Sequence, residues 1–160
     1  MMNYFELFKI PVSLRVDKST LPKKYFELQR QSHPDFHANT GQDEQAEMLE
    51  RSSQINKALQ TFRDEDLTIK YVLQLKGLLE EEEKYSLPPE FLMEVMELNE
   101  NISDHSADLV KLFEDNIYKS VKEIIEHYDD NHPQTGDLLK VKEYYFKKKY
   151  LRRILERIAD

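Results

Sequence analysis

Three side chains that could do chemistry stand at alternate positions near the start of the chain: His33, Asp35 and His37. Imidazole nitrogens and carboxylate oxygens are ligands that divalent metals accept, so a metal-dependent hydrolase is one hypothesis. The pattern is weak as a metal site, because Pro34 kinks the segment and no further ligand has a matching spacing. The other histidines lie far apart in the sequence: His105, His127 and His132.

The tripeptide His33-Pro34-Asp35 also has the residue types of a recognition loop. Pro34 fixes the backbone, Asp35 offers a carboxylate to an arginine of another protein, and His33 adds a directional donor or acceptor. Such a loop binds without making or breaking bonds. The plain alternative is a helix-ending turn, in which the proline stops one helix and the aspartate caps the next segment.

The residues on either side predict two helices that meet at this tripeptide. The first begins at about Thr20, because a Ser19 N-cap leaves Pro22 in the first turn. The second is predicted from Asp43 to Phe62. Together they form an antiparallel hairpin with the tripeptide at its tip. The inward positions recur at helical spacing: Leu21, Tyr25, Leu28 and Ser32 before the loop, and Met48, Ile55, Ala58, Leu59 and Phe62 after it.

Basic residues occupy the opposite face of the first hairpin helix. Lys23 and Arg30 lie away from the inward stripe, with Lys24 at the flank and Glu27 among them. The face is either a solvated helix surface or an electrostatic docking surface for an acidic patch. Docking charges of this kind affect the association rate and orientation, and salt weakens them.

The rest of the chain is also predicted to be helical. A short helix is expected at Tyr4–Phe8 and another at Asp66–Lys76, followed by Gly77 as a suitable C-cap. The acidic run 80–84 is typical of a solvated linker. Short connections join three further amphipathic patterns, which predicts an antiparallel bundle of helices: 89–102, 104–128 and 137–158. We therefore expect an all-α fold, with a hairpin domain at 1–76, a linker at 77–88 and a three-helix antiparallel bundle at 89–160.

The first bundle helix is too broadly apolar for one buried face. One stripe suffices for a core: Phe91, Val95, Leu98 and Ile102. Leu92, Met93 and Met96 lie 100 to 200° from Phe91 at about 100° per residue. Either the helix is wedged deeply, or an apolar strip edged by acidic residues is exposed to bind a protein partner. The second reading assigns these residues to one binding surface, with Phe146 of the last helix added: Leu92, Met93, Met96, Glu97, Glu100 and Phe146.

Composition excludes several classes of protein. The net charge of −8 resides in residues 78–160, which hold 12 basic and 20 acidic side chains, so nucleic-acid binding is not expected. The 160 residues include no Cys, which removes disulfides and thiolate sites. No phosphate-binding glycine loop or nucleophile elbow is present, so no enzyme activity and no cofactor are expected. Without an apolar span or a signal peptide, we expect a cytoplasmic protein with no membrane partner.

Several motifs together resemble the HscB type of J-domain co-chaperone. They cover nearly the whole chain: Asp17, Leu28-Gln29-Arg30-Gln31, His33-Pro34-Asp35, Ile55-Asn56, Tyr71-Val72-Leu73, Leu75-Lys76-Gly77 and Phe91-Leu92-Met93-Glu94-Val95-Met96-Glu97-Leu98. The resemblance implies a J-domain at 1–76 that stimulates the ATPase of a heat-shock chaperone of the DnaK/HscA type. It also implies a bundle that presents the iron–sulfur cluster scaffold, of the IscU type, to that chaperone. A general J-domain protein serving another client is the alternative.

The resemblance assigns roles residue by residue, with no catalytic or metal-binding residue among them. Chaperone binding falls on His33, Pro34, Asp35, Lys23, Lys24 and Arg30, and scaffold binding on Leu92, Met93, Met96, Glu97, Glu100 and Phe146. The chain departs from the family pattern at Phe36, where a lysine often follows the tripeptide, and at Ser32, where a tyrosine often precedes it. The Cys-rich metal module of some eukaryotic members is absent, so no structural zinc is expected.

Overall fold

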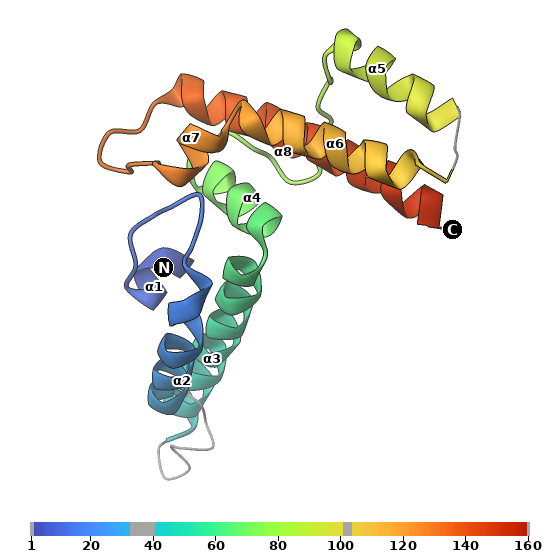
Figure 1. Ribbon diagram of the computed structural model, residues 1–160. Helices are drawn as coiled ribbons and strands as arrows, with labels where there is room; N and C mark the ends of the chain where they lie inside the picture. The colour runs from blue at the N-terminus through green and yellow to red at the C-terminus, as the bar shows by residue number, and fades with distance from the viewer. Residues whose placement is uncertain (1, 33–40, 101–103, 160) are drawn as a thin grey trace. The chain divides into compact units, whose positions relative to one another are not determined.

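The computed structural model describes residues 2–32, 41–100 and 104–159 (Figure 1). All regular elements within these ranges are helices, which confirms the predicted all-α fold. The contacts divide the chain into two compact units, Met1–Val72 and Leu73–Asp160. Among the described residues, no helix has both the length and the apolar character that a membrane crossing requires. The cytoplasmic location expected from the sequence stays a prediction.

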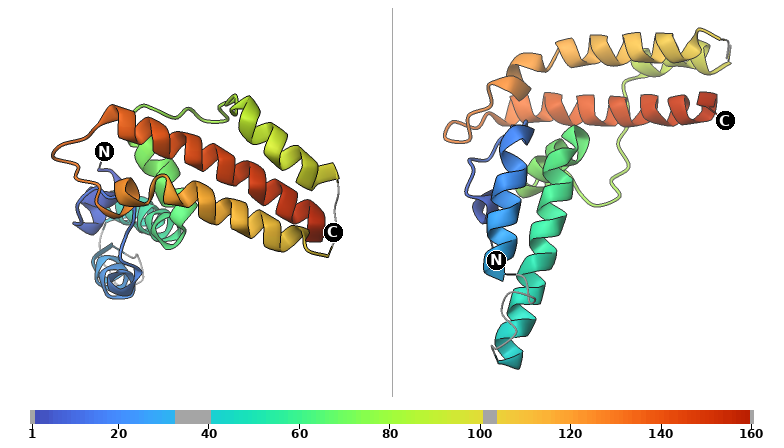
Figure 2. Two further views of the ribbon diagram at one scale, coloured as in Figure 1. Left: turned by 45° about the horizontal axis from the view of Figure 1, so that its top comes forward. Right: turned by 60° about the horizontal axis from the view of Figure 1, so that its bottom comes forward.

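The first unit contains the hairpin predicted from the sequence. Helix α2 (Leu21–Ser32) packs side by side with α3 (Gln42–Arg63), and the short α1 (Tyr4–Phe8) contacts both (Figure 2). Asp17 caps a 3₁₀ turn at Lys18–Thr20 that leads directly into α2. The fully buried side chains of this unit come from α1, the segment after it, α2, α3 and α4 (Glu65–Leu75): Phe5, Phe8, Leu14, Leu21, Ile55, Ala58, Phe62 and Val72.

A buried polar network sets the register between α2 and α3. The Ser52 hydroxyl donates to Gln29 Oε1 at 2.7 Å, and Gln29 Nε2 donates to the Ser52 carbonyl at 3.3 Å and to Asn56 Oδ1 at 3.1 Å. The Tyr25 hydroxyl donates to the same Asn56 oxygen at 2.7 Å. Gln29 and Ser52 are both buried, so these bonds offset their desolvation. The network fixes the rotation of α2 and therefore which residues it turns toward solvent.

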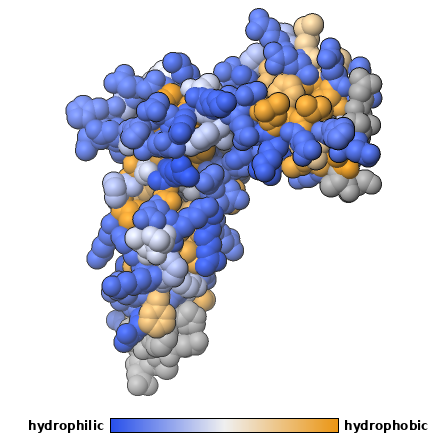
Figure 3. All heavy atoms as spheres, viewed as in Figure 1, coloured by the Kyte–Doolittle hydropathy of each residue, from blue (hydrophilic) through white to orange (hydrophobic). Residues whose placement is uncertain are grey.

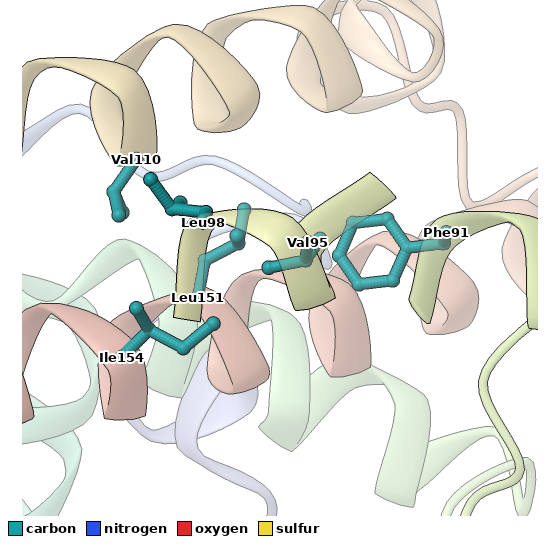
Figure 4. Close-up of a cluster of buried hydrophobic side chains, with 6 residues drawn as sticks. All are labelled: Phe91, Val95, Leu98, Val110, Leu151 and Ile154. Atoms are coloured by element: carbon teal, nitrogen blue, oxygen red, sulfur yellow. The ribbon is translucent and has the colours of Figure 1, made fainter. Parts of the chain in front are cut away.

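The second unit is built around the 25-residue helix α8 (Thr135–Ala159). Helix α6 (Ser106–Lys119) packs along α8, and α5 (Pro89–Glu100) contacts α6. Figure 4 shows side chains of these three helices meeting in one core: Phe91, Val95 and Leu98 from α5, Val110 from α6, and Leu151 and Ile154 from α8. The predicted core stripe of α5 is therefore confirmed for its residues up to Leu98, while Ile102 lies outside the described residues.

The single helix predicted at 104–128 is wrong. The chain instead forms α6, a break, and the short α7 (Lys122–Glu126). At the break the Ser120 hydroxyl donates to the Ile117 carbonyl at 2.7 Å, and the Val121 N–H donates to the Tyr118 carbonyl at 3.0 Å. A serine side chain that takes a carbonyl from the helical ladder competes with its continuation. The sequence carries no proline or glycine here that would have marked the break.

The segment between α4 and α5 includes the acidic run 80–84, which is exposed except at the half-buried Glu83. Gly77 has a φ of 70° and ends α4, as predicted. Further on, Glu83 forms a 2.7 Å ion pair with Lys142 of α8, and both side chains are largely buried. The Tyr85 ring stacks on Phe146 of α8. Residues 82–87 therefore lie along α8 as part of the second unit; we call them the 82–87 strap.

Candidate protein-binding surfaces

The basic face predicted on α2 is present, but one of its three basic side chains is partly buried. Lys23 and Arg30 are exposed. Lys24 is half-buried, and its Nζ lies 3.4 Å from the Phe8 carbonyl, to which it donates. Part of the Lys24 charge is therefore engaged inside the first unit. Lys23 and Arg30 keep exposed side chains on this face.

The tripeptide His33-Pro34-Asp35 lies outside the described residues, as does the rival metal site with His37. The structure describes the frame on either side. Helix α2 ends at the buried Ser32, directly before the tripeptide, and α3 begins at Gln42 after it. The Phe36 departure from the family pattern also lies in the part of the chain that is not described.

Helix α5 exposes the apolar strip predicted for a binding surface. Met93 is 67% exposed and Met96 48%, while Leu92 is half-buried beside them. Glu97 and Glu100, near the C-terminal end of α5, are also exposed. In the space-filling view, hydrophobic side chains gather over the part of the second unit that carries α5 (Figure 3). The alternative of a deeply wedged helix is therefore excluded for Met93 and Met96.

Phe146 is buried, although the sequence placed it on the exposed binding surface. Its side chain is only 8% exposed; its ring stacks on Tyr85 at a centroid distance of 4.5 Å and an interplanar angle of 1°. Tyr145 adds an edge contact at 5.2 Å. The sequence does not show this burial, because Tyr85 follows the run 80–84 that was predicted to be solvated and its contact with Phe146 is tertiary. The aromatic at Tyr85, beside an acidic run, was the signal for a packed segment.

Leu92 and Phe146 nevertheless share one surface feature. Both line an open hollow of about 710 Å³ between α5, α8 and the 82–87 strap. Leu87 and Tyr150 add apolar lining, and Arg153 contributes a cation. Phe146 therefore belongs to the floor of this hollow, whereas Met93 and Met96 are exposed side chains of α5. A partner that covers the strip would meet a mixed surface with a recess beside it.

The electrostatics of the strap hold it against α8. The hydrogen bond from Lys142 lowers the pKa of the Glu83 carboxyl, and the Glu80 backbone N–H lowers it further. The Lys142 ammonium lies 5.7 Å from the centroid of the Tyr85 ring, and Lys149 lies 6.0 Å from that of Phe146. These contacts are structural, since they order the strap that covers Phe146.

Within the described ranges, no three His, Asp or Glu side chains are placed to hold a metal ion. His127 and His132 each pair with a neighbouring carboxylate, from Glu123 and Asp129, at 3.6 and 3.0 Å. The features that distinguish the surface are a basic helix face in one unit and an apolar strip in the other.

Comparisons with known proteins point to one family along the whole chain. The family described as the HSCB C-terminal oligomerisation domain matches residues 87–159. A co-chaperone protein HscB homolog of Vibrio cholerae serotype O1 (strain M66-2) is 37% identical over 107 residues, which cover 66% of this chain and 63% of that relative. The match therefore spans less than two thirds of the length of that relative. The homolog of Shewanella baltica (strain OS195) is 37% identical over 128 residues, covering 78% and 73%.

Two solved structures share the fold. The human co-chaperone protein HscB superposes with a TM-score of 0.79 at 28% identity, covering 99% of this chain and 81% of the human one. The chaperone HscB from Vibrio cholerae gives a TM-score of 0.73 at 24% identity, covering 99% and 96%. The fold is all-helical, and the curated relatives are named as co-chaperones. The chain belongs to the HscB family, as its motifs indicated.

Proposed function

We propose that this protein stimulates the ATPase of a DnaK/HscA-type chaperone and brings an IscU-type iron–sulfur scaffold to it. The observation that carries the proposal is the exposed Met93 and Met96 strip of α5 in a chain of the HscB family. An apolar strip that the core does not need is a surface for a protein partner. On this proposal the protein itself has no catalytic residue and needs no metal or cofactor.

The chaperone-binding part of the proposal rests on the hairpin of the first unit. Residues His33, Pro34 and Asp35 connect its two helices, and the exposed Lys23 and Arg30 lie on the helix that leads into them. The cations attract an acidic chaperone surface, and the tripeptide then biases the conformation of the ATPase.

The variant His33→Gln tests the chaperone-binding part. It is expected to fold normally and to lose ATPase stimulation, because the imidazole acts on the partner rather than on the core. Single-turnover ATP hydrolysis by the chaperone measures stimulation, and circular dichroism with thermal melting checks the fold. Normal stimulation by a folded His33→Gln variant would remove the J-domain assignment.

The scaffold-binding part rests on the presence of both buried core residues and exposed apolar residues in α5. Val95 is fully buried in the core, whereas Met96, the next residue, is exposed. Truncating Leu92 and Met96 together therefore removes contact area for a partner at little cost to the core. Apolar anchors at an interface centre commonly cost about 2 kcal/mol each when truncated, roughly 30-fold in affinity. Glu97 and Glu100 add charge at the edge of the strip.

Calorimetric titration with an IscU-type scaffold decides this part. The double variant Leu92→Ala with Met96→Ala is expected to bind far more weakly while still stimulating the chaperone in the absence of scaffold. A matched control is Leu109→Ala with Leu112→Ala, which truncates two exposed leucines of α6 in the same unit. Unchanged scaffold affinity in a folded Leu92/Met96 variant would refute the assignment.

Two other functions predict different outcomes. A general J-domain protein would stimulate the chaperone and fail to bind the scaffold. A metal-dependent hydrolase using His33, Asp35 and His37 would retain a stoichiometric metal ion after purification, which elemental analysis detects. Stimulation combined with scaffold binding by metal-free protein distinguishes the proposed co-chaperone from both.

A further inference from the structure

Helix α2 exposes a large aromatic side chain that packing does not explain. Phe26 is 62% exposed, although it stands on the same helix as the buried Leu21 and Leu28. Within the described residues its ring forms no contact with another aromatic ring. A phenylalanine left in water stabilises the fold little, since the benefit of an apolar side chain comes from its burial.

The position of Phe26 is set by the buried network described above. Gln29 turns inward to Ser52, and this fixes the rotation of α2. Phe26 then falls on the outer face, with Lys23 three residues before it and Arg30 four residues after it. Residues three and four apart are neighbours on a helix surface. The aromatic ring therefore sits between two cations on the helix that leads into the tripeptide.

We infer that Phe26 is an apolar anchor that docks into the ATPase chaperone, between the two cationic contacts of Lys23 and Arg30. The inference rests on the proposed function and adds to it the chemistry of the partner surface. That surface must carry acidic groups on both sides of an apolar recess that accepts an aromatic ring. An interface in which charges surround a desolvated aromatic centre is the usual arrangement of a binding hot spot.

The chaperone fits this face better than a second copy of the chain does. The flanking cations require an acidic partner, and the first unit carries almost no net charge, with 10 basic and 11 acidic residues in 1–72. Pairing of two identical α2 faces would bring Lys23 and Arg30 of the two copies together, so like charges would repel. The face also continues in sequence into the tripeptide, which serves the same partner.

Alanine substitution gives the first test. Phe26→Ala is expected to raise the concentration needed for half-maximal ATPase stimulation about tenfold or more, because a central aromatic contact is lost. Maximal stimulation and the melting temperature should stay unchanged, since His33 is intact and Phe26 is exposed. Leu67→Ala serves as the matched control, because it truncates an exposed leucine of α4 in the same unit.

A fluorescence probe gives the second test. The chain contains no tryptophan, so Phe26→Trp places the sole indole of the protein at this position. Addition of the DnaK/HscA-type chaperone, with the spectrum of the chaperone alone subtracted, is expected to shift the emission to shorter wavelength as the ring leaves water. Raising the concentration of the variant alone should cause no shift.

The outcomes separate this inference from the function on which it rests. If His33→Gln abolishes stimulation while Phe26→Ala leaves the half-maximal concentration unchanged, the anchor is refuted and the proposed function stands. An emission that does not move at saturating chaperone refutes the anchor as well. A shift with the variant alone would assign the face to self-association and overturn the inference. Absence of stimulation by the wild-type chain would remove both the proposed function and the anchor.

Discussion

Replacing Phe146 by alanine should destabilise the second unit strongly, although the sequence alone placed this residue on a binding surface. The side chain is 8% exposed and stacks face to face on Tyr85. Truncating a buried phenylalanine typically costs about 3–5 kcal/mol, through the lost transfer free energy and the cavity left behind. The stacked pair alone contributes about 0.5–1.5 kcal/mol beyond its buried area. The Tyr85 side of the 82–87 strap would lose its support on α8.

Equilibrium unfolding in urea measures this effect, followed by circular dichroism. We expect the free energy of unfolding of Phe146→Ala to fall by about 3 kcal/mol or more, a large fraction of the stability of a domain. Leu139→Ala is the matched control, because it truncates an exposed leucine of the same helix and should cost less than about 0.5 kcal/mol. A loss below about 1 kcal/mol for Phe146→Ala would refute the packing described for the strap. A weaker scaffold affinity in this variant would then have to be read as the loss of a direct contact.

Three further perturbations test separate features. Gln29→Leu should cost about 1–3 kcal/mol in urea unfolding because it leaves the buried Ser52 hydroxyl without its acceptor; a smaller cost would mean that water or another group replaces it. Lys23→Ala with Arg30→Ala should weaken chaperone docking and flatten its dependence on salt, and a steep slope that persists would place the charge contact elsewhere. The pKa of Glu83 is lowered in the folded state from its usual 4.5. The ionised Glu83 carboxylate therefore stabilises the fold above pH 4.5, and this stabilisation is lost as the pH falls through the folded pKa. Stability measured from about pH 6 down to about pH 3 should therefore converge for wild type and Glu83→Gln, and curves that stay parallel would contradict the ion pair.

The helical pattern was predictable wherever the buried face is also the apolar stripe of the sequence. For α5 this holds at Phe91, Val95 and Leu98, and the leftover apolar residues correctly indicated an exposed strip. In α8 the helical spacing of the sequence favours Tyr145 and Leu155 as inward residues, whereas the structure buries Tyr144 and Ile154 and leaves those two half-buried. The difference arises because two surfaces, α6 and the strap, pack on this helix, and one stripe describes only one of them.

The unbroken helix predicted at 104–128 and the surface position predicted for Phe146 were wrong for one physical reason. Local sequence patterns do not report the tertiary partners of a residue. The apolar spacing of Ile117, Val121 and Ile125 continues across the break between α6 and α7, so periodicity alone predicts an unbroken helix. The role of the Ser120 hydroxyl in ending α6 is visible only from its hydrogen bond to the Ile117 carbonyl. Likewise the burial of Phe146 depends on a segment about 60 residues earlier in the chain. Phe26 lies off the apolar stripe of α2, and among the described residues its ring contacts no other aromatic ring, so the stripe gave no role for it.

The placement of α8 at the centre of the second unit has a consequence for synthesis on the ribosome. The first unit needs only residues up to Val72, so it can fold while the rest of the chain is still being made. The core beneath α5 needs Leu151 and Ile154, which are translated about 3 to 12 seconds after Phe91 at about 5–20 residues per second. During that interval Phe91, Val95 and the methionines beside them are displayed without their supporting helix. The nascent chain is therefore most exposed to aggregation through the same helix that we propose as the binding surface of the folded protein.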